Sequence, residues 1–254
     1  MIISYKHKFI FIHCRKTAGS TIKCLLNRHL GPNDIQIGSW HESIKRGGKI
    51  NMRFIRDVLS TDVIFNKRTP KCFLALLGYI LLNKNALACI NSIHKSKYDF
   101  KKASHPTARE LKNKYPHAFN EFFTFCFIRN PYDKVVSEYL FQNKKSEYDM
   151  TFLSFLKDLR CREQKADYLP TYATNWPFYA INDEPAVDYI AKFEDLVREI
   201  ERVSTIIGID IDADEIPIVK KQSRRDYRSY YDERKKQLVE DIYSKEIKYF
   251  NYEF

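Results

Sequence analysis

Glycine, proline and long apolar runs are scarce in this sequence, and each shortage excludes a class of protein. With 7 glycines and 9 prolines among 254 residues, the chain is neither collagen-like nor a low-complexity segment. The longest apolar run, Cys72 to Leu82, is shorter than the roughly 20 residues that a membrane-spanning helix needs. The first residues lack the small-residue cleavage site of a secretory signal. We therefore expect a folded, cytoplasmic protein.

Paired cysteines are also missing. The six cysteines form no CxxC pair and have no regular spacing, whereas zinc sites and disulfide frameworks both depend on such spacing. Scattered cysteines in apolar surroundings are typical of free thiols in a reducing compartment. The sequence predicts that the protein requires no metal and has no disulfide framework.

Positive charge is in excess, and the excess lies in one segment. The formal net charge is +11. Between His41 and Lys114 there are 16 Lys or Arg residues against 5 Asp or Glu, and the rest of the chain holds 27 of each sign. Such a segment is either a solvated helix surface or a docking face for an acidic partner.

Residues 45–102 have the character of an insertion. Gly47-Gly48 and Thr69-Pro70 punctuate this basic segment, which predicts a mostly helical insertion. Its apolar stretch, residues 72–90, is either a buried helix or an interfacial helix that associates peripherally with the inner face of a membrane. Periodicity leaves both interpretations open.

A buried strand, a polar turn and a helix follow one another near the start of the chain. Lys8–His13 mixes β-branched and aromatic residues, which is typical of a buried strand. Apolar residues then occur at helical spacing, at Ile22, Leu25, Leu26 and Leu30.

The same order recurs twice along the chain. Residues 122–129 predict a second strand, followed by a helix with Asn130 as its cap and Pro131 as its first residue. Residues 187–193 predict a third strand, followed by a helix that ends at Gly208, and an amphipathic helix closes the chain. This order predicts one α/β domain over residues 1–254, a P-loop-like three-layer fold with a mainly parallel central sheet flanked by helices, plus the helical insertion.

The first polar turn has the composition of an anion-binding site. Backbone N–H groups at a helix N-terminus bind anions, and Gly19 lets the backbone approach closely. Ser20 and Thr21, as cap and first-turn residues, add hydroxyls, and Lys16 adds a mobile charge. A phosphate or sulfate group suits this turn, although it is not a Walker A loop, because its lysine precedes the glycine. The alternative is an ordinary connection whose lysine is solvated.

The second polar turn has cationic and hydroxyl groups as well. Arg129 ends the predicted strand, and Ser137 lies about two helical turns further on. An arginine fork and a serine hydroxyl can bind a second phosphate. The alternative is an arginine that caps or pairs locally.

Together, the two turns resemble the superfamily of sulfotransferases that use 3′-phosphoadenosine 5′-phosphosulfate (PAPS). More narrowly, they are similar to the branch of carbohydrate sulfotransferases such as heparan sulfate 2-O-sulfotransferase and many bacterial relatives. The family's PKTAG[ST][ST] pattern, which binds the 5′-phosphosulfate, is matched by Lys16, Thr17, Ala18, Gly19, Ser20 and Thr21. Its RNPxxxxxS pattern, which holds the 3′-phosphate, is matched by Arg129, Asn130, Pro131 and Ser137.

The match has one departure and one uncovered segment. Arg15 stands where the family has proline before the lysine, which removes a source of rigidity and offers a second cation at the sulfate. Further similarity before the second strand, around the third strand–helix unit and in the closing helix extends the resemblance to about two thirds of the chain. The basic insertion at 45–102 is not covered.

The resemblance implies transfer of the sulfuryl group of PAPS to a hydroxyl of a polysaccharide, oligosaccharide or glycolipid, with adenosine 3′,5′-bisphosphate (PAP) as product. Lys16 and the amides of the turn would neutralise the charge that grows on the 5′-phosphate. A histidine would take the proton of the hydroxyl. The basic segment would guide an acidic saccharide acceptor, and no nucleic acid partner is expected.

His105 is the candidate general base, because it matches the histidine of the family's His-x-[ST]-Ala-Arg-Glu segment. His41 is the second candidate, and His41 and His13 are both expected on the acceptor side. Arg224 and Arg225 fall where relatives place a loop over the nucleotide, so they either contact the 3′-phosphate or belong to a solvated charge run.

Two other functions are weighed against this one. A nucleotide-dependent phosphotransferase is disfavoured, because the Walker A glycine and a clear Walker B aspartate are missing. A non-catalytic nucleic-acid-binding protein would use the basic segment, but it leaves both phosphate-binding patterns unexplained.

Overall fold

The computed structural model describes residues 1–60, 91, 94–98, 100, 105–145, 150–161, 172–211, 216 and 225–254. Most of the predicted insertion lies outside these residues, including the apolar stretch 72–90, and so does Arg224. The described beginning of the insertion is helical, since it contains α3 (Met52–Leu59). In the described parts of the chain, no helix is both long enough and apolar enough to span a bilayer.

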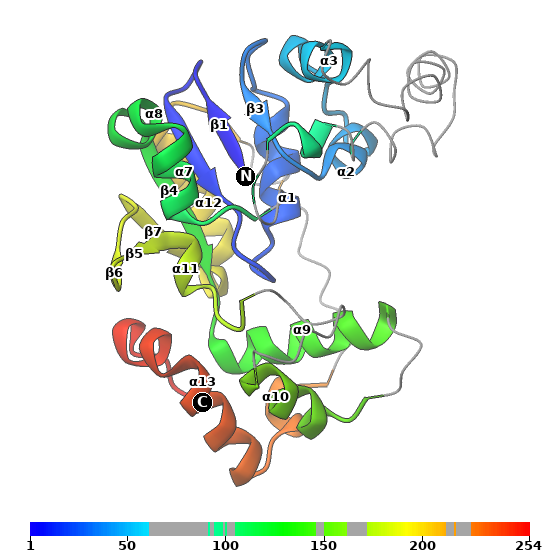
Figure 1. Ribbon diagram of the computed structural model, residues 1–254, viewed down its shortest axis with the longest axis vertical. Coiled ribbons are helices and arrows are strands. Elements are labelled where there is room, and N and C mark those ends of the chain that lie inside the picture. Colours follow the sequence, from blue (N-terminus) through cyan, green and yellow to red (C-terminus); the bar gives the residue numbers. More distant parts are fainter. Residues whose placement is uncertain are drawn as a thin grey trace.

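Five strands form the central sheet in the order β3-β1-β2-β4-β7 (Figure 1). They are β1 (Ile2–Ser4), β2 (Phe9–Ile12), β3 (Ile35–Gln36), β4 (Phe123–Ile128) and β7 (Tyr189–Lys192). The neighbours β2, β4 and β7 are parallel, and β1 is antiparallel to both β2 and β3. All strands except β1 therefore run in one direction, which confirms the mainly parallel sheet.

Helices on both faces of the sheet give three layers. On one face, α1 (Gly19–Asn27) and α12 (Leu196–Ile206) pack against the phenylalanines of β2 and β4. On the other face, the isoleucines of β2 pack with α7 (Ala108–Lys114), α8 (Pro116–Glu121) and α11 (Trp176–Tyr179). Every residue of β2 is buried, as expected of a strand covered on both faces.

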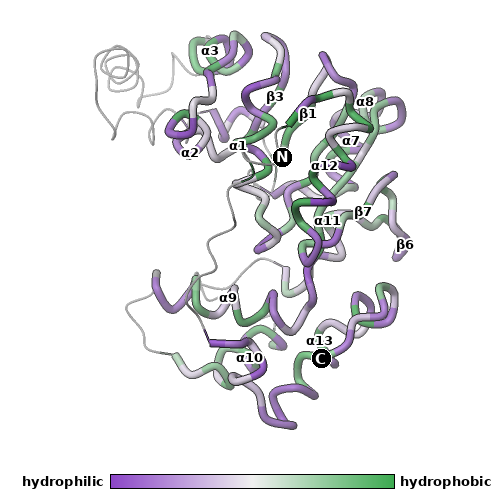
Figure 2. The backbone as a smooth tube through the Cα atoms, turned by 180° about the vertical axis from the view of Figure 1, so that it is seen from behind, coloured by the Kyte–Doolittle hydropathy of each residue, from purple (hydrophilic) through white to green (hydrophobic). Residues whose placement is uncertain are grey.

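A second helical group has its own core. It consists of α9 (Pro131–Lys145), α10 (Phe152–Arg160) and α13 (Glu233–Phe250), joined by the short 3₁₀ helix η3 (Tyr227–Tyr230). In Figure 1 this group lies below the sheet, on the side from which β4 leads into α9. Figure 2 shows hydrophobic stretches both in the strands and along the helices, where they alternate with hydrophilic ones, as in α3.

The remaining elements are small. They are α2 (Trp40–Lys45), the 3₁₀ helix η1 (Phe193–Asp195) and the hairpin of β5 (Ala180–Ile181) and β6 (Glu184–Pro185). The pairing of β2 with β4 positions the candidate site, because Ile12 at the end of β2 lies opposite Cys126 near the end of β4. The two predicted turns therefore leave the sheet at the same edge.

Local sequence explains where the helices begin and end. The Asn130 side chain accepts a hydrogen bond from the Tyr132 amide at 3.0 Å, and Pro131 is the first residue of α9, which confirms both predictions. Asp232 caps α13 through the Lys235 amide. Shortly after α12, Gly208 has a φ of +65°, which glycine adopts without strain.

Candidate active site

The loop between β2 and α1 is held in a strained conformation. Lys16 and Ala18 have φ angles of +62° and +60°, which cost a non-glycine residue about 1–2 kcal/mol each. Ala18 is the N-cap of α1, and no side chain caps this helix end. The prediction that Ser20 is the cap is therefore wrong, since Ser20 is the second residue of α1. The uncapped first-turn amides have no partner within the helix and can bind an anion.

Gly19 provides space for a histidine ring. A Cβ atom at this position would lie 1.8 Å from Cδ2 of His13, far inside van der Waals contact. The φ angle of Gly19 is not positive, so the glycine is required by the close approach of the ring and not by the backbone conformation. His13, the residue after β2, therefore packs directly against the N-terminus of α1.

His13 and His105 lie together. Their ring centroids are 4.4 Å apart, and Nδ1 of His105 lies 2.8 Å from the backbone carbonyl oxygen of His13. Because a carbonyl oxygen only accepts hydrogen bonds, Nδ1 carries the proton and Nε2 of His105 keeps its lone pair. Of the predicted acceptor-side histidines, His13 thus reaches the candidate base.

Both histidines are neutral at pH 7. The pKa of His105 is lowered to about 3, mainly by burial. The bond to the His13 carbonyl raises this pKa, whereas the positive charges of Arg15, the chain amino group and Lys23 add to the lowering. Burial also lowers the pKa of His13 well below its usual value. Nδ1 of His13 is buried without a hydrogen-bond partner in the described part of the chain.

Arg129 joins the two predicted turns. Its Nη1 donates to the backbone carbonyl oxygen of Lys16 at 3.1 Å, so the end of β4 is bonded directly to the loop after β2. The guanidinium also pairs with Asp133 at 2.5 Å and lies over the ring of Phe193 at 4.2 Å. Burial lowers the pKa of Arg129 to about 10, which still leaves it charged at neutral pH.

The side chain of Lys16 extends toward α9. Its ammonium lies 4.3 Å from the ring centroid of Phe141, and 40% of the Phe141 side chain is exposed. Ser137 lies one helical turn earlier and is half-buried, so it shares a face of α9 with Phe141. The groups predicted to bind the two phosphates thus lie around one helix.

Arg15 pairs with a buried carboxylate. Its Nη2 lies 2.5 Å from Oε1 of Glu138, which is fully buried in α9. Burial alone would raise the pKa of Glu138, but Arg15 and Lys134 outweigh it and lower that pKa. A role of Arg15 as a second cation at the sulfate stays a prediction.

Two predicted residues lie less centrally, and a third is outside the described residues. His41 is half-buried in the first turn of α2, and among the described residues its ring is not one of those that pack against His13 or His105. Its near neighbour Ser39 donates to Ser20 at 3.2 Å, so α2 starts beside the first turn of α1. Arg225 is exposed just before η3, and Arg224 is outside the described residues. Their roles stay predictions.

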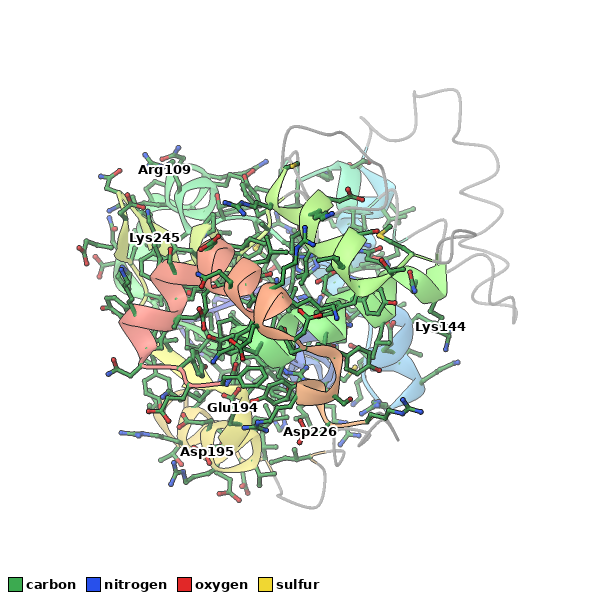
Figure 3. The ribbon with its side chains drawn as sticks, turned by 90° about the horizontal axis from the view of Figure 1, so that it is seen from below. Arg109, Lys144, Glu194, Asp195, Asp226 and Lys245 are labelled. Atoms are coloured by element: carbon green, nitrogen blue, oxygen red, sulfur yellow. The ribbon has the colours of Figure 1, made fainter. Side chains whose placement is uncertain are left out.

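The structure adds residues that the motifs did not indicate. The Asn130 amide donates to Glu194 at 2.6 Å, and its side chain donates to the Glu253 carbonyl at 2.9 Å. Figure 3 shows Glu194 and Asp195 where α12 begins, close to the segment that follows α13. The second turn is therefore fixed by the end of the chain.

In the first turn, Thr17 uses its hydroxyl within the loop, where it donates to the Cys14 carbonyl.

Comparison with known proteins assigns the family. A sequence model of the sulfotransferase family matches residues 1–253, so the chain belongs to this family, and the protein is a transferase. It is also 31% identical over 100 residues to an uncharacterized protein of Archaeoglobus fulgidus, a match that covers 38% of this chain and 76% of the relative. No solved structure matched the chain. No group of three or more metal-ligating side chains gathers among the described residues.

Replacing Gly19 by alanine is expected to destabilise the protein by about 1–3 kcal/mol, because the new methyl group overpacks against the His13 ring. Ser20→Ala, at the next and exposed position, should change the free energy of unfolding by less than about 0.5 kcal/mol. Urea unfolding of both variants measures the difference. A Gly19→Ala variant as stable as the wild type would contradict the packing of His13.

Acid is expected to destabilise the fold through the buried histidines. The folded-state pKa of His105, about 3, lies below its unfolded value of about 6.5. The stability that depends on a neutral His105 is therefore fully present above pH 6.5, and it is lost as the pH falls toward 3. Between pH 7 and pH 5 the loss is about 2 kcal/mol for His105. Urea unfolding should show this extra loss in the wild type relative to His105→Gln, and equal losses would count against it.

Proposed function

We propose that this protein transfers the sulfuryl group of PAPS to a hydroxyl of a carbohydrate acceptor. The observation that carries the proposal is the hydrogen bond from Arg129 to the Lys16 carbonyl. It joins two cationic turns at one edge of the sheet, which suits a ligand with two separate phosphates. Membership of the sulfotransferase family supports sulfuryl transfer as the reaction class.

The residues of the site fit such a donor. The uncapped N-terminus of α1 offers backbone amides and the hydroxyls of Ser20 and Thr21 to the 5′-phosphosulfate. Arg129 and Ser137 are the candidates for the 3′-phosphate. The buried, unpartnered Nδ1 of His13 beside this helix end is also what a site shaped around an absent polar ligand would have.

Lys16 has the charge that the reaction needs. PAPS supplies the sulfuryl group, and its 5′-phosphate gains negative charge as the bond to sulfur breaks. The Lys16 ammonium, swung back to the start of α1, would neutralise that charge, and the positive end of the helix dipole adds to the effect. The lysine is flexible, so it can leave the Phe141 ring when a stronger anionic partner is present.

His105 has the tautomer that a general base needs. Its Nδ1–H is taken by the His13 carbonyl, so Nε2 can accept the proton of the acceptor hydroxyl. A pKa of about 3 makes the free enzyme's histidine a weak base. Anions bound beside Arg15 would offset the positive charges that lower this pKa, and so strengthen the base when donor is bound.

The carbohydrate acceptor and a cytoplasmic location belong to the same proposal, in which residues 72–90 are either a buried helix or a helix that contacts a membrane surface. The resemblance of the two turns to carbohydrate sulfotransferases supports the acceptor class, and the basic segment between His41 and Lys114 favours an acidic saccharide. No observation favours a phosphotransferase or a nucleic-acid-binding protein over this assignment.

PAP is expected to raise the melting temperature of the protein by clearly more than ATP with magnesium does, because only PAP offers a 3′-phosphate to Arg129. Lys16→Ala should lower turnover by about 10²–10³-fold and remove most of the shift. Lys112→Ala, an exposed lysine of α7, is the matched control and should behave as the wild type. Stabilisation by ATP and magnesium alone would instead favour a phosphotransferase.

His105→Ala is expected to lower turnover by about 10²–10⁴-fold while the affinity for PAP stays within a factor of about two. The measurement is transfer of labelled sulfate to a panel of saccharides, beside a binding titration with PAP. His41→Ala is tested in parallel. Activity that survives in His105→Ala and is lost in His41→Ala would make His41 the base.

A further inference from the structure

The side chain of Asn175 holds the backbone of the anion-binding loop. Its Oδ1 accepts from the Arg15 amide at 3.0 Å, and its Nδ2 donates to the Arg15 carbonyl at 3.0 Å. One amide side chain thus satisfies both backbone groups of the residue that precedes Lys16. Asn175 is 3% exposed, so water competes little for these two bonds.

Asn175 is itself fixed from the opposite side. Its backbone amide donates to Oε1 of Glu246 at 3.2 Å, and the same oxygen accepts from the Tyr179 hydroxyl at 2.9 Å. Glu246 is buried in α13, where Lys134 is a nearby positive charge. The contacts therefore run without a break from α13 through Asn175 to the loop.

The loop needs such support. Lys16 and Ala18 both adopt the left-handed conformation, which persists only where the surroundings enforce it. Arg15 stands at the position where the family pattern that this loop resembles has proline. Proline has no N–H group, so the bond from the Arg15 amide to Asn175 exists only because the proline is missing.

We propose that Asn175 is a positioning residue that takes the place of the missing proline. It fixes the Arg15 backbone, so that Lys16 and the first-turn amides of α1 face the donor before the donor binds. This inference rests on the proposed function, because it assigns the loop to donor binding. Both side-chain hydrogen bonds of Asn175 go to the Arg15 backbone, so Asn175 acts through the loop, and its effect is specific to donor affinity.

Asn27 offers a matched control. It is also 3% exposed, and its side chain also makes two hydrogen bonds, to the Gln36 side chain and the Lys49 amide. It lies at the far end of α1 from the loop. Asn27→Ala and Asn175→Ala therefore remove comparable buried contacts, but only Asn175→Ala removes the bonds to Arg15.

The experiment measures melting temperature, PAP affinity and the Michaelis constants of both substrates. Both variants should lower the melting temperature. Only Asn175→Ala should weaken PAP binding, by about tenfold or more, and raise the KM for the donor while the KM for the acceptor is unchanged. A PAP affinity that falls equally in both variants, or in neither, overturns the inference.

A conservative variant adds a rescue. In Asn175→Asp, one carboxyl oxygen can accept from the Arg15 amide, but the other donates to the Arg15 carbonyl only when protonated. PAP affinity relative to the wild type should therefore be low in Asn175→Asp at pH 8 and recover as the pH falls through the pKa of the new carboxyl, which burial raises above its ordinary value of about 3.9. Asn175→Ala should show no such recovery. If the PAP affinity of Asn175→Asp relative to the wild type does not change with pH, this counts against the positioning role of Asn175.

Amide exchange separates failure of the inference from failure of the proposed function. Without nucleotide, the Arg15 amide should exchange faster in Asn175→Ala than in the wild type or Asn27→Ala. If the Arg15 amide exchanges at the same rate in Asn175→Ala, the positioning role of Asn175 is overturned even if PAP binds. If the wild type binds no PAP, the proposed function fails. The proposed link between Asn175 and donor binding then fails with it.

Discussion

The hydrogen bond from Arg129 to the Lys16 carbonyl is the contact on which the candidate site depends. It converts two sequence motifs more than a hundred residues apart into one group of cations at one edge of the sheet. The parallel pairing of β2 with β4 makes it possible, because both strands end at this edge. A ligand that binds at either turn therefore meets the charges of both.

The surroundings of the site hold unfavourable conformations and buried charges in place. The strained loop is bonded to Asn175, Arg15 is paired with the buried Glu138, and Glu138 also feels the charge of Lys134. Removing one member of such a network leaves its partner buried and unsatisfied, which costs more than the bond contributes. The helices α9 and α13 thus position the edge of the sheet that carries the candidate site, in addition to packing on each other.

Sequence patterns predicted the elements that carry the motifs. Phe9–Ile12, Phe123–Ile128 and the helix from Pro131 are strongly patterned and were expected within a residue or two. The strands Ile2–Ser4 and Ile35–Gln36 were missed, because two or three residues are too short for an apolar period to show. Helix α7 was also missed, although Thr107 and Glu110 form a capping box, a local signal that could have found it.

The limits of prediction were different at the site. The motif residues Lys16 and Arg129 could be named from spacing, but no local pattern links Asn175 to Arg15, 160 residues away. Likewise, the glycine at position 19 was expected to give room for an anion, and it also gives room for the His13 ring. Such constraints arise from tertiary contacts, which a single sequence does not record.

The most direct test of whether the two turns form one site compares the affinities of two variants for two ligands. Affinities of Lys16→Ala and Arg129→Ala are measured for PAP and for adenosine 5′-phosphate, which lacks the 3′-phosphate. If one nucleotide spans both turns, Lys16→Ala weakens the binding of both ligands to a similar degree, whereas Arg129→Ala weakens the binding of PAP by more than that of adenosine 5′-phosphate. Equal losses for both ligands in Arg129→Ala, or none for either, would contradict the account.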